Sequence, residues 1–204
     1  MKKAALLILL ICVLTSVGFA QLGFSKGLIG GLNIATVSGS DVSSSVKSIT
    51  GYAAGVYLEF SPPGPFSVEA EGLYSVKGSK SDIPGFLLVP ATTSTTNAAY
   101  IDIPLLLKFS LPVPVVSPYL CAGPVYSTLL SAKTKREGTG YATTDTDVKD
   151  QFAKSDFGLV FGAGISLTSL RVDARYNMGL SSLDKAGNLK MYNRVIALYV
   201  GLSL

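Results

Sequence analysis

Few residues of this sequence could carry out chemistry. The 204 residues include no histidine and two cysteines. Without histidine the chain lacks the usual general base of serine hydrolases, and metal centres built on histidine or on paired cysteines are excluded as well. We therefore expect no catalytic activity, no cofactor and no metal site.

A polar segment in the second half of the chain holds most of the remaining candidates. Asp145, Asp147 and Asp150 could offer carboxylate oxygens to calcium, but their spacing completes no calcium-loop pattern. A solvated acidic segment therefore explains them better. The basic residues just before them are candidates for contact with the phosphates of outer-leaflet lipid, and an ordinary basic interface explains them equally well: Lys133, Lys135 and Arg136.

The other charged residues alternate with apolar ones, which indicates β-strands. Side chains of a strand point to opposite faces with a period of two. Glu69 and Glu71, for example, share one parity, and Val68 and Ala70 share the other. Eight segments show this alternation, and each is long enough to cross a bilayer when tilted. The segments are 24–37, 51–60, 66–77, 100–109, 118–131, 155–167, 170–181 and 192–204.

The connectors between these segments alternate between long and short. The long ones cover 38–50, 78–99, 132–154 and 182–191. Bacterial membrane barrels have short periplasmic turns and longer outer loops. Charged residues make up only 15% of the chain, against about 25% in soluble domains. The sequence therefore predicts an all-β fold, an eight-stranded antiparallel up-and-down transmembrane β-barrel with both termini on the periplasmic side.

Two features favour the apolar face as the outer one. The charged face is rich in glycine, which suits a crowded interior. The apolar face carries aromatic residues near the strand ends, as in the girdles of membrane barrels: Tyr52, Phe60, Phe66, Tyr74, Phe109, Phe157, Tyr176 and Tyr192. In 118–131 either face could point outward, and we favour Leu120 and Tyr126. A soluble, lipocalin-like barrel would need the reverse orientation and is the alternative.

Strand order predicts a charge network inside the barrel. If the strands close in sequence, the third and seventh lie opposite each other, so Glu69 and Glu71 face Arg171 and Arg175 across a lumen that side chains can fill. Buried charges of this kind are tolerated when they are paired. The predicted network comprises Glu59, Glu69, Glu71, Asp102, Lys108, Arg171, Asp173 and Arg175. Our hypothesis is a plug that stabilises the barrel and closes it; the alternative is a narrow water-filled pore for small solutes.

The start of the chain resembles an export signal. Lys2 and Lys3 precede an apolar run, and Gly18-Phe19-Ala20 forms a small-x-small cleavage site. We expect a cleaved signal peptide over 1–20 and a barrel domain over 21–204. Cys121 then lacks an internal disulfide partner, and we interpret it as a small strand residue.

Three segments resemble a known family. Gly27–Asn33, Tyr100–Lys108 and Pro118–Pro124 are similar to the PorT-like outer membrane beta-barrel domain family. The resemblance implies an eight-stranded barrel in a Gram-negative outer membrane. The partners we expect are outer membrane lipid, the outer membrane assembly machinery, and envelope proteins or external ligands that the long loops contact. The small net charge of +4 demands no nucleic acid.

Three functions remain open from the sequence. The first is an integral outer membrane barrel with a structural or interaction role. The second is a narrow outer membrane pore, against which the predicted charge network argues. The third is a soluble ligand-binding barrel with its apolar face inward.

Overall fold

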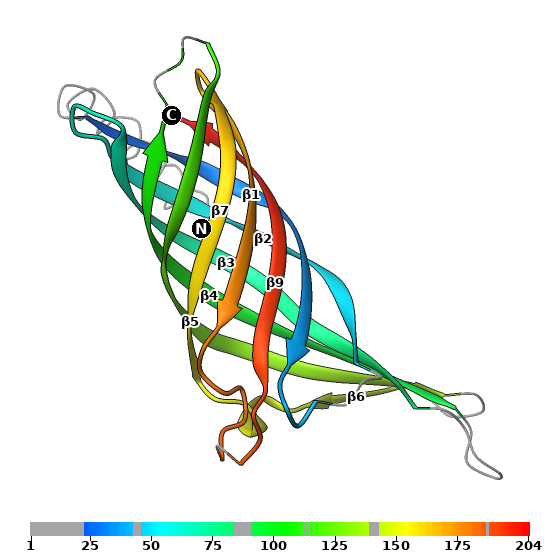
Figure 1. Ribbon diagram of the computed structural model, residues 1–204. Helices are drawn as coiled ribbons and strands as arrows, with labels where there is room; N and C mark the ends of the chain where they lie inside the picture. Colours follow the sequence, from blue (N-terminus) through cyan, green and yellow to red (C-terminus); the bar gives the residue numbers. More distant parts are fainter. Residues whose placement is uncertain are drawn as a thin grey trace, which may run out of the picture.

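Antiparallel strands wind into a closed ring around one lumen (Figure 1). The computed structural model describes residues 23–42, 46–83, 91–111, 113, 115–138, 143–186 and 188–204. The predicted signal segment 1–20 lies outside these described residues. None of the described helices is long and apolar enough to span a membrane.

Within the described residues, eight strands form the ring and a short ninth strand extends one hairpin. The order around the ring is β1–β2–β3–β4–β5–β7–β8–β9, and β9 pairs back onto β1. Every neighbouring pair is antiparallel, which confirms the predicted up-and-down barrel. The elements are β1 (Phe24–Ser38), β2 (Val46–Phe60), β3 (Phe66–Ile83), β4 (Thr92–Ser110), β5 (Ser117–Gly138), β6 (Thr144–Asp147), η2 (Lys149–Gln151), β7 (Ser155–Leu167), β8 (Leu170–Gly179) and β9 (Tyr192–Ser203).

The wall of the barrel is much taller on one side than on the other. Strands β3, β4 and β5 have 18, 19 and 22 residues, whereas β7, β8 and β9 have 13, 10 and 12. In Figure 1 the ends of the long strands run out to the lower right, away from the ring. Residues 46–50, 78–83, 92–99 and 132–138, predicted as connectors, therefore belong to strands, and that part of the prediction is wrong.

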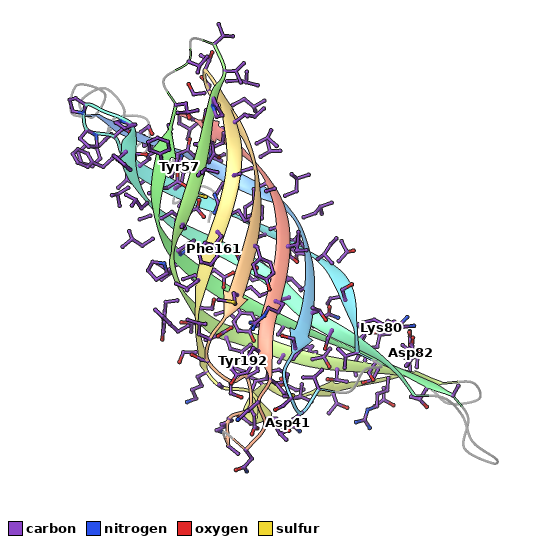
Figure 2. All side chains as sticks on the ribbon, viewed as in Figure 1. Asp41, Tyr57, Lys80, Asp82, Phe161 and Tyr192 are labelled. Atoms are coloured by element: carbon purple, nitrogen blue, oxygen red, sulfur yellow. The ribbon has the colours of Figure 1, made fainter. Side chains whose placement is uncertain are left out.

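The outward face of the ring is apolar and the inward face is polar. Leu32 is 63% exposed and Leu120 is 61% exposed, whereas Glu69 is 0% exposed. Leu120 and Tyr126 both point outward from β5, on the face we favoured. The orientation of a soluble barrel with an apolar interior is therefore wrong for this chain, and the side chains in Figure 2 can be seen to cover the outside of the ring.

Two irregularities divide the tall wall into an inner and an outer part. The register shifts between Ser48 and Ala53 in the β2–β3 pair and between Ala99 and Tyr100 in the β4–β5 pair. Beyond Leu130 the parity of β5 is reversed, so that Ala132 is buried. The inner part holds the charged lumen, and the outer part forms the mouth of the barrel.

Candidate functional site

Two acidic residues of β3 meet two arginines of β8 inside the barrel. Arg175 donates from Nη1 to Glu71 Oε2 at 2.7 Å and from Nη2 to Glu71 Oε1 at 2.8 Å. Arg171 donates to Glu69 through both terminal nitrogens and reaches Glu71 Oε1 at 3.3 Å. The structure therefore brings together the four residues that strand order predicted to face each other.

The network continues toward the short turns. Lys108 Nζ lies 2.8 Å from Glu59 and 3.3 Å from Glu69. Arg175 Nε donates to Asp173 at 2.5 Å, and the Tyr119 hydroxyl donates to the same carboxylate at 2.8 Å. Such charge-assisted bonds compensate the loss of water around a buried charge only when each charge has partners of this kind.

A second, smaller group of charges lies nearer the mouth. Lys77 donates to Asp102 at 2.8 Å and to Ser127 at 3.4 Å. Asp156 accepts a bond from the Asn193 amide at 2.8 Å, while its other oxygen has no described partner. Asp102, which we predicted in one network with the arginines, thus pairs instead with Lys77. The sequence prediction omitted Lys77, although it has the same parity in β3 as Glu69 and Glu71.

Each cation of these two groups also lies over a tyrosine ring. Cation–π contact of this kind is favourable, more so where water is excluded. The distances to the ring centroids are 3.7 Å for Arg171 over Tyr57, 4.4 Å for Lys108 over Tyr119, 5.0 Å for Lys77 over Tyr100 and 5.1 Å for Arg175 over Tyr199. The prediction assigned aromatic residues only to the girdles. The signal for the inward tyrosines was their parity, which is that of the charged face.

Glycines of the inward face make room for the long side chains. A Cβ on Gly201 would lie 2.5 Å from Arg171 Nε, and a Cβ on Gly162 would lie 2.8 Å from Cys121 Sγ. Cys121 is buried and free, as expected of a small strand residue. Side chains therefore fill the inner part of the lumen and pack against one another.

The outer part of the lumen holds two adjoining cavities with volumes of about 420 Å³ and 270 Å³. Four residues line both: Thr96, Phe152, Leu183 and Met191. Two segments fold into the mouth to make one wall. Phe152 forms a β-bridge with Asp184, and the Ala153 amide donates to the Leu183 carbonyl at 2.8 Å. These cavity residues were missed by the sequence reasoning, although apolar residues within polar connectors were the available signal.

The larger cavity is the more polar one. Hydroxyls of Thr96 and Thr134 lie 2.9 Å apart, and Arg136 lines the wall beside them. Asp184 also lines it, but its Oδ2 accepts bonds from the amides of Asn188 at 2.8 Å and Leu189 at 3.1 Å. The carboxylate is thus engaged by its own loop.

The three predicted basic residues of β5 do not share a face. Alternation places Lys133 and Lys135 on the outer face, whereas Arg136 lines the cavity. Lys135 Nζ lies 2.6 Å from Glu137, and this hydrogen-bonded pairing raises the pKa of Lys135 and lowers the pKa of Glu137. Asp147 of β6 pairs in register with Lys133. No metal-binding acidic cluster is found among the residues that the structure describes.

The predicted girdle residues lie on the outside of the ring. Phe66 and Phe109 contact each other near the short turns, with centroids 5.3 Å apart, and Tyr52 and Tyr74 lie 6.3 Å apart farther out. Tyr192 is only half-buried beside Arg194. Exposed fractions of 39–52% apply to the other seven: Tyr52, Phe60, Phe66, Tyr74, Phe109, Phe157 and Tyr176.

The chain matches one known family over most of its length. The model of the family described as "Outer membrane protein beta-barrel domain" matches residues 19–185. This match covers most of the chain, including the strands that carry the charge network. The sequence matches no curated protein at a significant level.

Solved outer membrane proteins resemble the fold at low sequence identity. Ail, the attachment invasion locus protein of Yersinia pestis, solved with the heparin analogue sucrose octasulfate, is 16% identical; the match covers 89% of this chain and 99% of that one, with a TM-score of 0.45. Neisserial surface protein A is 13% identical over 89% and 97%, with a TM-score of 0.46. The outer membrane enzyme PagL is 12% identical over 88% and 98%, with a TM-score of 0.41.

Proposed function

Because the chain belongs to the outer membrane protein beta-barrel domain family and is an integral protein of the bacterial outer membrane, we propose that it is a closed barrel that acts through contacts at its outer end. The tall wall of β3, β4 and β5 and the cavities beside it are the surfaces that meet external ligands or envelope proteins. Conduction and catalysis are not part of this role.

The observation that carries the proposal is the double contact of Glu71 across the lumen. Glu71 is held by Arg175 at 2.7 Å and by Arg171 at 3.3 Å, and tyrosines lie against both arginines. An eight-stranded barrel is only wide enough for its side chains to fill. A solute that entered the lumen would have to displace this paired, stacked cluster.

Planar bilayer recording of the purified barrel tests the closed lumen. We expect no steady unitary conductance after insertion. Heat-modifiable mobility on a gel verifies that the same sample is folded, and swelling of vesicles in small sugars gives a second readout. Steady channels, or swelling that depends on sugar size, in a sample that is fully heat-modifiable would overturn the proposal in favour of the pore.

The absence of catalysis is supported by the side chains themselves. The chain has no histidine, and the lumen carboxylates Glu69, Glu71 and Asp173 are each bonded to arginine. A general acid or base must be free to exchange its proton with a substrate. These groups serve structure in our proposal.

The girdles and basic residues set the depth of the barrel in the membrane in this proposal. Phe66 and Phe109 lie at the periplasmic interface, and Tyr52 and Tyr74 lie at the outer one. Lys133 and Lys135 then contact the phosphates of outer-leaflet lipid, while Arg136 does not. Residues 1–20 are cleaved on export, and the assembly machinery inserts the barrel. The finer relationship to PorT-like barrels is part of this proposal and rests on the resemblance of three segments, which lie in β1, β4 and β5.

Surface labelling tests this orientation. With Cys121 replaced by serine, a cysteine placed by Thr95→Cys on the outer part of β4 should react with a membrane-impermeant maleimide on intact cells. A cysteine placed by Ser61→Cys, in a short turn, is the matched control and should react only after the cells are opened. The reverse pattern would contradict the orientation.

A further inference from the structure

We propose that the two outer cavities form one site for a small amphipathic anion, whose apolar body fills the smaller cavity and whose negative group pairs with Arg136. The inference rests on the proposed interaction role of the outer end and names the class of ligand. Strands β1 to β6 and the 148–152 segment contribute lining residues to this site, as do Leu183, Asp184, Leu189, Met191 and Asn193.

The smaller cavity suits an apolar body. Valines from β1 and β2, Val37 and Val46, line it together with Phe152, Leu183 and Met191. Its carboxylate, Asp41, accepts a bond from the Lys190 amide at 2.7 Å. Its volume of about 270 Å³ and that of its neighbour, about 420 Å³, fall together in the range of small-molecule sites, which are mostly apolar with a few placed polar groups. The ligand is therefore of alkyl or aryl type and small.

The larger cavity supplies one uncompensated positive charge. No salt bridge links Arg136 to a carboxylate in the part of the chain that the structure describes, in contrast to the four lumen cations. Asp184, the carboxylate that shares the cavity, is bonded to the amides of its own loop. Hydroxyls of Ser94 and Thr146 lie in the same lining. A carboxylate or sulfate group of a ligand would find a guanidinium fork and neutral donors there.

The charges below the cavities fix the direction in which such a ligand lies. Tyr100 and Asn193 form the floor of the smaller cavity. Asn193 is bonded to Asp156, which has an oxygen without a described partner, and Asp102 lies in the same group. An anionic group pointing inward would approach these carboxylates, and one pointing outward meets Arg136. The apolar end therefore enters first.

Methionine methyl groups report on this site with a built-in control. Residues 21–204 contain two methionines. Met191 lines both cavities, whereas Met178 follows Ala174 and Tyr176 on the lipid-facing parity of β8. With ¹³C-methyl methionine in the folded barrel, we expect octanoate to shift the Met191 signal in a saturable way. The Met178 signal should move little and without saturation, because it senses only partition into the lipid or detergent.

Two variants separate the charged and apolar contributions. Arg136→Gln removes a charge-assisted bond and should weaken octanoate binding about tenfold, while octanol binding stays unchanged. Lys133→Gln, which removes a like charge on the other face of β5, is the matched control and should change neither. Val46→Phe fills the smaller cavity and should weaken both ligands.

Three results would overturn the inference: Met191 and Met178 shifting in parallel, octanoate bound no better than octanol, or equal losses in Arg136→Gln and Lys133→Gln. A variant that fails to fold is recognised by its heat-modifiable mobility. Bilayer conductance is measured separately, so the closed-lumen proposal can fail while the site stands, and the site can fail while the lumen remains closed.

Discussion

The inner and outer halves of the lumen are enclosed by the same strands but are filled in different ways. In the inner half every described cation is paired, as Lys108, Arg171 and Arg175 are, and the inward glycines leave room for their length. In the outer half several inward strand residues are small and neutral, such as Ala98 and Thr96, Arg136 has no salt bridge among the described residues, and space remains.

The difference arises from the surroundings of each half. In the orientation that we propose, the inner half lies within the bilayer, where an unpaired charge and unfilled polar space are both costly. The outer half lies at the mouth, where connectors can fold inward and water can enter. Phe152 packs against the cluster that contains Ala98 and Tyr100 at the mouth, and Leu183 lines the same cavity. The same ring of strands thus encloses a filled plug in its inner half and an open site in its outer half.

Reversing one charge in the inner half should have the largest effect on the free energy of unfolding. Arg175→Glu places a carboxylate beside Glu71 and Asp173, and breaking a buried ion pair costs about 3–5 kcal/mol. We expect a loss of at least this size in the free energy of unfolding, measured by urea titration of the barrel in lipid vesicles with tyrosine fluorescence and gel mobility.

Two controls make that result specific to the pairing. Reversing Glu71 as well, in the double variant Glu71→Arg with Arg175→Glu, should recover a large part of the loss. Arg136→Glu makes the same reversal in the outer half and should change stability by no more than about 0.5 kcal/mol. If the double variant is no more stable than the single one, the two residues do not act as a pair.

Adding a single methyl group should lower the free energy of unfolding by a smaller amount, and this amount should again differ between the two halves. A Cβ on Gly55 would lie 1.9 Å from the Gly72 carbonyl oxygen, so Gly55→Ala should cost about 1–3 kcal/mol. Val46→Ile adds a methyl group to a residue that lines the cavity and should be nearly neutral. The same urea titration measures both.

A glycine on the outer face provides the matched control for crowding. A Cβ on Gly72 would meet nothing within 4 Å, so Gly72→Ala should leave the free energy of unfolding nearly unchanged. Equal losses for Gly55→Ala and Gly72→Ala would mean that the strands lose stability for a reason other than inward packing.

The inner half could be predicted from the sequence because its information is local and periodic. Alternation assigned Glu69 and Arg175 to the inward face, and closure of eight strands in order placed them opposite each other. The tyrosine contacts escaped prediction, because parity shows that Tyr57 and Tyr199 point inward but does not give the height at which an arginine crosses the lumen.

The outer half could not be predicted because its strands lack that periodicity. Residues 92–97 are Thr, Thr, Ser, Thr, Thr and Asn, a composition that also suits a loop, and only pairing with β3 and β5 makes them a strand. The register shift opposite Tyr100 reverses the parity of β5 beyond Leu130. The bridge from Phe152 to Asp184 joins two connectors far apart in the chain, so no local pattern shows it.

The smallest expected effect concerns the exposed charges of the tall wall, which Figure 2 shows at Lys80 and Asp82. Lys47 Nζ donates to Asp82 at 2.7 Å and Thr93 Oγ1 donates to it at 2.9 Å. These bonds, the one from Lys47 first, hold the pKa of Asp82 below its usual value, which is about 3.9 for aspartate. The stabilisation is therefore fully present above that value and is lost as the pH falls through the lowered pKa.

A carboxyl-carbon NMR titration measures this directly. We expect a midpoint for Asp82 below about 3.9, a rise toward that value in Lys47→Met, and no change in Lys154→Met. The free energy of unfolding should not change in Lys47→Met, since exposed ion pairs contribute little and salt screens them. Arg175→Glu should remain destabilising at high salt, because its charge is buried. Two results would contradict the electrostatic difference between the two halves. One is an Asp82 midpoint that does not change in Lys47→Met; the other is a loss of unfolding free energy in Arg175→Glu that disappears at high salt.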